Sequence, residues 1–366
     1  MNILVPNAGS SSLKLSLVDG RDRVLGDQEF EVAEGRLDRE QLARAIHGLD
    51  APEAIGHRIV HGGPRYRQSL RIDGAVLRYL ETITDLAPLH LPAALAGVAA
   101  AQDLLPDVPG VACLDTAFHA GMPPAAFTYA IPESWRERHG IQRFGFHGFS
   151  HSYAARRAAE ILKRPASDLR IVTCHLGSGA SLAAVEEGRS VDTTMGFTPL
   201  EGLVMATRSG TLDPGMLLWL QRHARIGEPE LTEALDRQGG LKALAGTGDM
   251  REVLRKLSAG DEKAKLAFDV YIHRLRGSIA AMAAAMHGLD ALVFTGGVGE
   301  NAAPVRAAAA GGLAFMGVEI DPALNATARA DLDVSAPEAR VRTLVVKARE
   351  DVEVAREVRR VLEAPR

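Results

Sequence analysis

The chain has 366 residues and a formal net charge of -4, from 42 basic and 46 acidic residues. This length is too great for one ordinary hydrophobic core and predicts two domains. The charge excludes a global basic surface for nucleic acid or an anionic membrane, and no segment approaches the ~20 apolar residues of a membrane span. Because its two cysteines, Cys113 and Cys174, lie in apolar strand-like runs, we expect buried thiols in a cytoplasmic protein. The N-terminal residues read as a strand at once, so we expect no cleavable leader.

The first predicted element is a strand–turn–strand unit at the N-terminus. Residues 3–5 read Ile-Leu-Val and residues 7–14 read Asn-Ala-Gly-Ser-Ser-Ser-Leu-Lys, after which apolar and polar residues alternate as in a half-buried strand. Glycine lets backbone N–H groups approach an anion, and serine hydroxyls and a lysine add donors and charge. We interpret the turn as a phosphate cradle, although one Gly/Ser turn alone would more often be an ordinary hairpin.

The next segments predict an α/β domain. Apolar spacing indicates a helix over residues 41–48, and flanking prolines bracket a second helix over residues 91–105. Residues 111–114 read as a buried strand that ends at Asp115. Alternation of strands and helices is typical of an α/β sheet.

A Gly/Pro-rich segment then predicts a domain boundary, and the opening motif returns beyond it. A helix over residues 150–162 and a strand-like run over residues 171–174 precede residues 175–181, His-Leu-Gly-Ser-Gly-Ala-Ser. The two units align without a gap when Gly9 is matched with Gly177. The repeat favours a duplicated domain that closes on one polyphosphate.

The second half of the chain adds a nucleotide signal. An apolar stripe predicts a long helix over residues 261–286, followed by a buried strand over residues 291–294. Residues 295–301, Thr-Gly-Gly-Val-Gly-Glu-Asn, then predict a Gly-rich turn, and open α/β sheets bind nucleotides where a buried strand ends in such a turn. Residues 351–362 resemble an amphipathic helix that would pack back on the first domain.

Three other segments place polar residues among glycine and apolar residues: residues 56–63, 144–148 and 195–202. This mixture is typical of a pocket for a small ligand with an apolar end and a charged end. His57 and His119 fit buried structural histidines best. The position of His147 between two glycine-containing turns favours a functional role for this residue.

Together these motifs resemble those of the acetate and propionate kinase family, within the superfamily of sugar kinases, Hsc70 and actin. The resemblance runs from residue 1 to about residue 357 through N-x-G-S-S-S-x-K, H-R-I/V-V-H-G-G, L-A-P-L-H, D-T-A-F-H, F-G-F-H-G, M-G-F-T-P-L-E-G and G-V/I-G-E-N. It implies two duplicated ribonuclease H-like, actin-like ATPase domains of α/β class around a nucleotide cleft. The N-terminal domain would comprise residues 1–116, with residues 351–366 packing back on it, and the nucleotide-binding and dimerisation domain residues 117–350.

The reaction implied by the resemblance is reversible phosphoryl transfer from ATP to acetate, which gives acetyl phosphate and ADP. It needs Mg²⁺, with Mn²⁺ as an alternative. A carboxylate nucleophile is already ionised at neutral pH, so catalysis can rest on positioning and charge neutralisation. The resemblance further implies a cytoplasmic homodimer, and we expect neither a nucleic acid nor a membrane partner.

The resemblance also assigns residues to roles. The catalytic residues would be Asp115, His147 and Arg208. Acetate would be bound by Arg58 and His90 and by an apolar pocket of Val60, Leu89, Phe146 and Pro199. Asn7 and Glu350 would lie at the metal together with Asp115. The nucleotide-binding residues would be Ser10, Ser12, Lys14, His175, Gly177, Ser178, Gly179, Asp249, Met250, Arg251, Gly297, Val298, Gly299, Glu300 and Asn301.

The chain departs from the family pattern in residues 346–349, before Glu350, which read Val-Lys-Ala-Arg where the family tends toward P-T-N, and at two positions near the nucleotide-binding residues. Ser178 stands where the family usually has Asn, and Ala206 where it usually has Gly. Gly297 and Val298 leave room for adenosine, so we expect ATP rather than pyrophosphate as the phosphoryl donor. The alternatives are a propionate or broader short-chain acyl kinase, since one methylene is worth only ~1–3 kcal/mol, and, more distantly, a non-kinase actin-like ATPase module.

Overall fold

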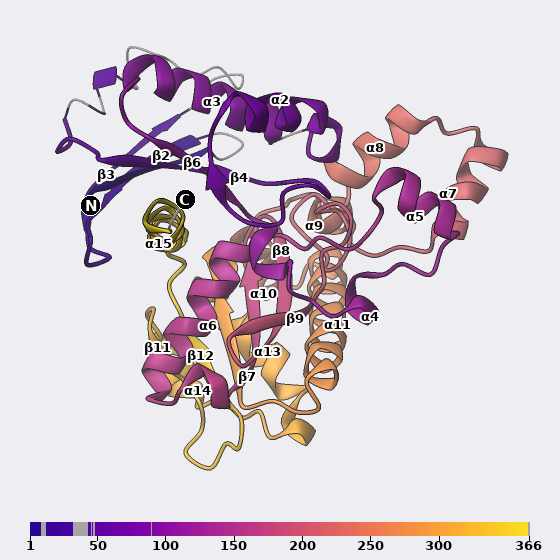
Figure 1. The fold of residues 1–366 in the computed structure, drawn as a ribbon. Helices are drawn as coiled ribbons and strands as arrows, with labels where there is room; N and C mark the ends of the chain where they lie inside the picture. The colour runs from indigo at the N-terminus through magenta and orange to yellow at the C-terminus, as the bar shows by residue number, and fades with distance from the viewer. Residues whose placement is uncertain (9–11, 32–42, 45, 47, 89, 365–366) are drawn as a thin grey trace. The chain divides into compact units, whose positions relative to one another are not determined.

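The computed structural model describes residues 1–8, 12–31, 43–44, 46, 48–88 and 90–364 (Figure 1). The chain divides into two compact units. The first consists of Met1–Ala120, Gly148–Tyr153 and Arg349–Arg366, and the second of Gly121–His147 and Ala154–Ala348.

The first unit is built on a six-stranded sheet with the order β3-β2-β1-β4-β6-β5. Its strands are β1 (Ile3–Ala8), β2 (Ser12–Val18), β3 (Val24–Glu31), β4 (Ala54–Ile59), β5 (Leu70–Arg71) and β6 (Gly110–Leu114). Strands β1, β2 and β3 pair antiparallel, β4 is parallel to both β1 and β6, and β5 is antiparallel to β6. The carboxyl ends of β1, β4 and β6 therefore meet at one edge of the sheet.

Helices cover both faces of this sheet (Figure 1). They are α2 (Gly74–Thr82), α3 (Leu91–Leu104) and α15 (Glu350–Glu363). Because side chains alternate along a strand, Ile3 of β1 packs with Val354 of α15 on one face, whereas Leu4 packs with Ala100 of α3 on the other. Residues far apart in the sequence thus share the core of one unit.

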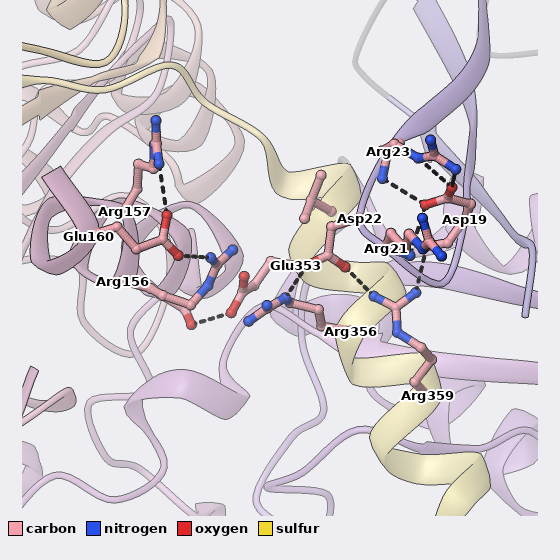
Figure 2. A network of polar contacts seen from close by, with 12 residues as sticks. Asp19, Arg21, Asp22, Arg23, Arg156, Arg157, Glu160, Glu353, Arg356 and Arg359 are labelled. Atoms are coloured by element: carbon pink, nitrogen blue, oxygen red, sulfur yellow. Dashed lines mark hydrogen bonds and ion pairs between the residues drawn. The ribbon is translucent and has the colours of Figure 1, made fainter. Parts of the chain in front are cut away.

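Ion pairs tie α15 to the turn between β2 and β3 (Figure 2). Asp22, at φ 63°, accepts hydrogen bonds from Arg356 Nε at 2.7 Å and from Arg359, and Arg359 Nη1 also donates to the Asp19 carbonyl at 3.1 Å. The carboxylate of Asp19 accepts from the backbone N–H of Arg23 at 2.9 Å. That hydrogen bond is the main cause that lowers the pKa of Asp19 to about 2, so the turn keeps its negative charge.

The second unit repeats the pairing of the first. Its six-stranded sheet has the order β11-β12-β10-β7-β8-β9. The strands are β7 (Arg170–Leu176), β8 (Ala180–Glu186), β9 (Arg189–Thr193), β10 (Ala291–Thr295), β11 (Leu332–Asp333) and β12 (Arg342–Val345). Strands β7, β8 and β9 are antiparallel, β10 is parallel to β7 and β12, and β11 is antiparallel to β12. The duplicated α/β architecture predicted from the two Gly/Ser hairpins is confirmed.

Helices make up most of the rest of the second unit. They are α4 (Pro124–Phe127), α5 (Glu133–His139), α7 (Pro214–Trp219), a π-helical turn (Leu220–Ala224), α8 (Glu228–Asp236), α9 (Gly240–Ala245), α10 (Met250–Ser258), α11 (Glu262–Ala285), α12 (Gly296–Asn301), α13 (Ala303–Gly311) and α14 (Pro322–Thr327). One helix, α6 (Gly148–Leu162), begins in the first unit and continues in the second. Its start belongs to the first unit because Gly148 N donates to the Asp115 carbonyl at 3.0 Å.

Most predicted helices are confirmed, with one correction. The helices predicted over residues 91–105, 150–162, 261–286 and 351–362 are α3, α6, α11 and α15. The prediction of a turn over residues 295–301 was wrong, because residues 296–301 form α12. The helix predicted over residues 41–48 falls largely outside the described residues.

Cys113 and Cys174 are free and buried, as expected from their strand-like surroundings. Among the helices that the structure describes, none has the length and apolar character needed to cross a membrane.

The buried histidine His57 on β4 predicts a pH-dependent stability. It is 4% exposed, and burial lowers its pKa from 6.5 to about 4. Below pH 6.5 the unfolded chain takes up a proton that the folded chain refuses, so the free energy of unfolding should fall by about 3 kcal/mol as the pH drops to about 4. Urea denaturation at several pH values should show a smaller fall in His57→Leu.

Exposed His139 on α5 provides the control. His139→Gln should keep the pH dependence of the wild-type protein. An identical pH dependence in His57→Leu and wild type would contradict the role of His57.

Candidate functional site

Arg58, near the end of β4, gathers three polar side chains in the first unit. Its Nε and Nη2 donate to the two carboxylate oxygens of Asp115 at 3.0 and 2.7 Å. Its Nη1 donates to Asn7 Oδ1 at 3.2 Å and to Glu350 Oε2 at 2.8 Å. Asn7, Arg58 and Asp115 meet because they stand at the carboxyl ends of β1, β4 and β6, and Glu350 is the first residue of α15.

This Arg58 cluster is shielded from most of the solvent and carries an excess of negative charge. The side chain of Asp115 is 2% exposed, that of Glu350 13% and that of Arg58 18%. Burial raises the pKa of the Asp115 carboxyl, and Arg58 opposes this shift by its charge and its hydrogen bonds. Burial would lower the pKa of Arg58, but the charges of Asp115 and Glu350 outweigh that effect and raise it. The cluster therefore contains one guanidinium and two acidic side chains. The negative charge that the guanidinium does not compensate would attract a further cation.

The oxygen donors of the Arg58 cluster fit a magnesium ion. Mg²⁺ prefers hard oxygen ligands and is commonly bound by one or two carboxylates plus water and substrate phosphates. Asn7, Asp115 and Glu350 offer an amide oxygen and two carboxyl groups. Within the part of the chain that the structure describes, no group of three or more His, Cys, Asp or Glu side chains forms a metal site. A metal bound by the oxygen atoms of this cluster would thus need further ligands from the substrate and from water.

In the second unit, His147 and Arg208 both lie beside Gly179 on the turn between β7 and β8. A Cβ atom placed on Gly179 would lie 3.4 Å from His147 Nε2 and 3.6 Å from Arg208 Nη1, so both groups lie within van der Waals reach of this glycine. His147 Nδ1 lies 2.8 Å from Ser181 Oγ, and its ring stacks on His175 with the centroids 4.4 Å apart. These contacts orient the ring so that Nε2 is the nitrogen nearest to Gly179.

Arg208 has neutral acceptors as its partners. Its Nη1 donates to the Pro199 carbonyl at 3.2 Å and approaches Met205 Sδ at 3.8 Å. None of the ion pairs between described side chains includes Arg208. Burial lowers its pKa, and the charge of Asp236 opposes this shift, but a guanidinium remains protonated at neutral pH. Arg208 is therefore a half-buried cation suited to an anionic ligand.

A pocket of about 480 Å³ lies in the second unit. It is lined by Gly177, Ser178, Gly248, Asp249, Met250, Arg251, Leu254, Gly297, Val298, Asn301, Ala302 and Pro304. Most of the nucleotide-binding residues predicted for the second domain thus line one cavity of the size typical of small-ligand sites. Asp249 accepts from the backbone N–H of Arg251 at 2.9 Å and caps α10 at the rim.

Several predicted residues lie elsewhere or outside the described part. Gly299 and Glu300 belong to α12 but do not line the pocket, and Lys14 pairs with Asp27 at 3.6 Å. Ser10 and Leu89 lie outside the described residues, and of Ser12 only the backbone, at the start of β2, is described. Val60 and His90 belong to the first unit, whereas Phe146 and Pro199 belong to the second.

The sequence did not predict a polar cluster of Tyr129, Arg143 and Glu201, the last of which lies on the segment that carries Pro199. The hydroxyl of Tyr129 donates to Glu201, and Arg143 Nη2 donates to Glu201 Oε1 at 2.7 Å. A Cβ atom on Gly196 would lie 1.8 Å from Glu201 Oε2, so only glycine leaves room for this cluster. Glu201 belongs to the motif M-G-F-T-P-L-E-G, but no pattern in the sequence indicates its partners, Tyr129 and Arg143. Ser181, which orients His147, was likewise part of a motif without an assigned role.

Two of the departures from the family pattern, Ser178 and Ala206, are neighbours. The backbone N–H of Ala206 donates to the Ser178 carbonyl at 3.0 Å. A Cβ atom on Gly248 would lie 3.2 Å from Ala206 Cβ, so the extra methyl group of Ala206 faces a residue that has no side chain. The absence of a side chain at position 248 thus provides the space that the methyl group of Ala206 needs.

Comparison with known proteins agrees with these motifs over the whole chain. The model of the Acetokinase family matches residues 31–356. The acetate kinase of Gloeobacter violaceus is 51% identical over 98% of this chain and 98% of its own length. The structure of Porphyromonas gingivalis acetate kinase is 35% identical with a TM-score of 0.89 and covers 99% of each chain. A propionate kinase from Francisella tularensis is also 35% identical, with a TM-score of 0.90 over 97% of this chain and 98% of its own. The chain belongs to the acetokinase family.

Proposed function

We propose that this chain is an acetate kinase, which reversibly transfers the γ-phosphoryl group of ATP to acetate and gives acetyl phosphate and ADP. Its family membership and its similarity to acetate kinases over nearly the whole length support this function. The observation on the chain itself that best supports phosphoryl transfer is Arg208, a half-buried cation beside His147 with neutral acceptors around it. Such a group suits a phosphoryl group in transfer, whose oxygens carry the charge of the transition state.

The proposed reaction needs no general base. An oxygen of the acetate carboxylate attacks the γ-phosphorus, and a new phosphorus–oxygen bond forms. The bond from the γ-phosphorus to the bridging oxygen breaks, and ADP leaves with the electron pair. Because the carboxylate is ionised at neutral pH, the enzyme has only to position the reactants and neutralise charge.

We assign the acetate carboxylate to Arg58. A guanidinium has five N–H donors, and the contacts of Arg58 to Asp115, Asn7 and Glu350 use four of them. The remaining N–H, on Nη2, would bind the substrate. Asp115 and Glu350 would keep the guanidinium in place while this single donor orients the nucleophile.

We assign the charge of the transferred group to Arg208 and His147. Arg208 would bind phosphoryl oxygens, and the contact of His147 Nδ1 with Ser181 would hold Nε2 ready to donate to the same group. Asn7, Asp115 and Glu350 would hold Mg²⁺, or Mn²⁺ in its place. The metal, when bound, neutralises charge on the nucleotide phosphates.

We further propose that the pocket lined by Gly297, Val298 and Asp249 receives the adenosine of ATP. Adenosine needs small residues at its walls, and Gly297 and Val298 supply them, which favours ATP over pyrophosphate as the donor. Ser178 would contact the phosphates through its hydroxyl, where the family usually offers a longer amide. We expect a cytoplasmic location, where ATP is available and thiols stay reduced, and no nucleic acid or membrane partner.

Substitution of Arg208 tests the proposed chemistry. Arg208→Ala should lower kcat at least 100-fold, because it removes a charge that acts on the transition state, while the affinity for ATP changes little. Trapping acetyl phosphate with hydroxylamine measures kcat, and calorimetry measures ATP binding. Exposed Arg237, which pairs with Glu233, gives the control Arg237→Ala with normal turnover. Loss of ATP binding together with normal single-turnover chemistry would refute the assignment.

The similarity to a propionate kinase makes chain-length preference the second test. We expect a higher kcat/KM for acetate than for propionate, and Val60→Ala should shift this ratio about tenfold toward propionate by making room for one methylene. Val76→Ala removes the same two methyl groups from the buried cluster beside Val60 and should leave the ratio unchanged. A clear preference of the wild-type enzyme for propionate would replace acetate kinase by propionate kinase as the function.

We also propose a homodimer formed through the second unit. Large apolar side chains are exposed in and beside α7: Leu212, Met216, Leu218 and Trp219 are 38, 39, 53 and 55% exposed. Apolar patches of this kind mark protein interfaces. Light scattering should give twice the chain mass of 39.0 kDa, and the double variant Leu218→Glu/Trp219→Glu should give a monomer.

Phe315, 78% exposed elsewhere on the second unit, supplies the control. Phe315→Glu should leave the dimer intact. A wild-type chain that stays at 39.0 kDa at micromolar concentration would exclude the proposed dimer.

A further inference from the structure

Arg306 on α13 is an arginine buried without an acidic partner. It is 1% exposed and heads the largest fully buried side chains of the described residues. Its Nη1 donates to the carbonyls of Gly299 and Glu300 at 2.9 and 2.8 Å. Its Nε and Nη2 donate to the side-chain and backbone oxygens of Asn325, both at 2.8 Å. No ion pair between described side chains includes Arg306, so neutral oxygens alone receive its hydrogen bonds.

The carbonyls that Arg306 binds belong to the last residues of α12. The final carbonyls of a helix have no partner inside the helix and carry partial negative charge, so a cation there is favourable. Burial of a charge is costly unless hydrogen bonds satisfy it, and these carbonyls supply them. Because α12 has six residues and is rich in glycine, it would not be stable on its own. Arg306 and α12 thus stabilise each other.

The other side of α12 faces the proposed nucleotide pocket. Gly297, Val298 and Asn301 line that pocket, whereas Gly299 and Arg306 are buried behind them. Any shift of α12 would therefore move the pocket wall. Arg306 itself does not line the pocket, and its influence must pass through the helix.

Asn325 on α14 fixes Arg306 in turn. It is 4% exposed, and its Nδ2 donates to the Ala303 carbonyl at 3.0 Å while its oxygens accept from Arg306. The backbone N–H of Asn325 donates to the Asp321 carbonyl at 2.9 Å. The guanidinium is therefore bound both by the carbonyls of α12 and by Asn325 on α14.

We propose that Arg306 is a positioning residue for the nucleotide: by binding the end of α12 from its buried side, it holds Gly297 and Val298 where they contact the adenosine. This inference rests on the proposed nucleotide role of the pocket. The proposal predicts different effects on the KM for ATP and on the KM for acetate, because no residue that Arg306 contacts belongs to the Arg58 cluster. Arg306 thus governs the KM for ATP and leaves the KM for acetate unchanged.

Steady-state kinetics of Arg306→Met tests the proposal. The KM for ATP should rise about tenfold or more, while the KM for acetate and kcat at saturating ATP stay within about threefold of wild type. Hydrogen exchange should become faster at residues 297–301. Asn325→Asp keeps an acceptor for Arg306 and should keep the wild-type KM for ATP, whereas Asn325→Leu removes it and should raise the KM. This second pair answers the question even where Arg306→Met folds poorly.

Arg276→Met is the matched control. Arg276 on α11 also binds a helix carbonyl, since its Nε donates to Ala308 of α13 at 2.9 Å, but it does not contact α12. Loss of this contact should lower Tm and leave the KM for ATP unchanged. Equal rises in the KM for ATP in Arg276→Met and Arg306→Met would reduce Arg306 to a general stabilising role and overturn the proposal.

Val298→Phe distinguishes failure of this proposal from failure of the nucleotide assignment. Phenylalanine at position 298 should fill the pocket and raise the KM for ATP. If it does so while Arg306→Met leaves the KM for ATP unchanged, the positioning role alone is wrong. If neither variant changes the KM for ATP, the pocket does not bind the nucleotide, and both proposals fall.

Discussion

The buried charge of Arg58 has to be matched by acidic groups, and this requirement joins distant parts of the chain. Asp115 lies 57 residues from Arg58 in the sequence and Glu350 292 residues away, yet both bind the same guanidinium. Removal of one partner from such a pair leaves an uncompensated charge and typically costs about 3–5 kcal/mol. The start of α15 is therefore bound to the carboxyl edge of the first sheet by electrostatics as well as by the apolar contacts of Val354. The same contacts of Arg58 therefore stabilise the fold of the first unit and position the residues of the candidate site.

Arg58, Arg208 and Arg306 differ in how their charge is compensated. Arg58 faces two carboxylates, Arg306 faces only carbonyl oxygens, and Arg208 has a single carbonyl and a thioether. Electrostatic attraction for an added anion should be strongest at Arg208, since a compensated cation attracts little. At Arg58, in the proposed function, a metal ion held by Asp115 and Glu350 would offset their charge, and acetate would bind through the one N–H that they and Asn7 leave free. Among these three arginines, Arg208 thus has the most uncompensated positive charge for a phosphoryl group, whereas the role of Arg306 is structural. The assignment of roles follows from this difference in surroundings as much as from motif positions.

The sequence predicted the elements whose signals are local. Alternating strands, Gly/Ser hairpins and long apolar stripes are repeated patterns, and β1–β2, β7–β8 and α11 follow them. Helix α12 was missed because its glycines disfavour a helix locally, and the group that compensates them, Arg306, comes after the helix has ended. Asn325 lies a further 19 residues along the chain, and no spacing rule connects it to Arg306. The partners of Glu201 escaped for the same reason, since Tyr129 and Arg143 lie 72 and 58 residues away.

The neighbouring departures Ser178 and Ala206 show how a chain can change a binding segment without loss of its geometry. An extra methyl group at position 206 needs space, and Gly248, on the rim of the same pocket, leaves that space open. The backbone hydrogen bond from Ala206 to Ser178 does not depend on either side chain, so it survives both substitutions. Ser178 lines the pocket and Ala206 does not, so only the side chain at position 178 belongs to the pocket wall, while the backbone that carries Arg208 keeps its hydrogen bonds. A change of the side chain at position 178 would alter the pocket wall, whereas the position of Arg208 depends on backbone contacts that neither side chain makes.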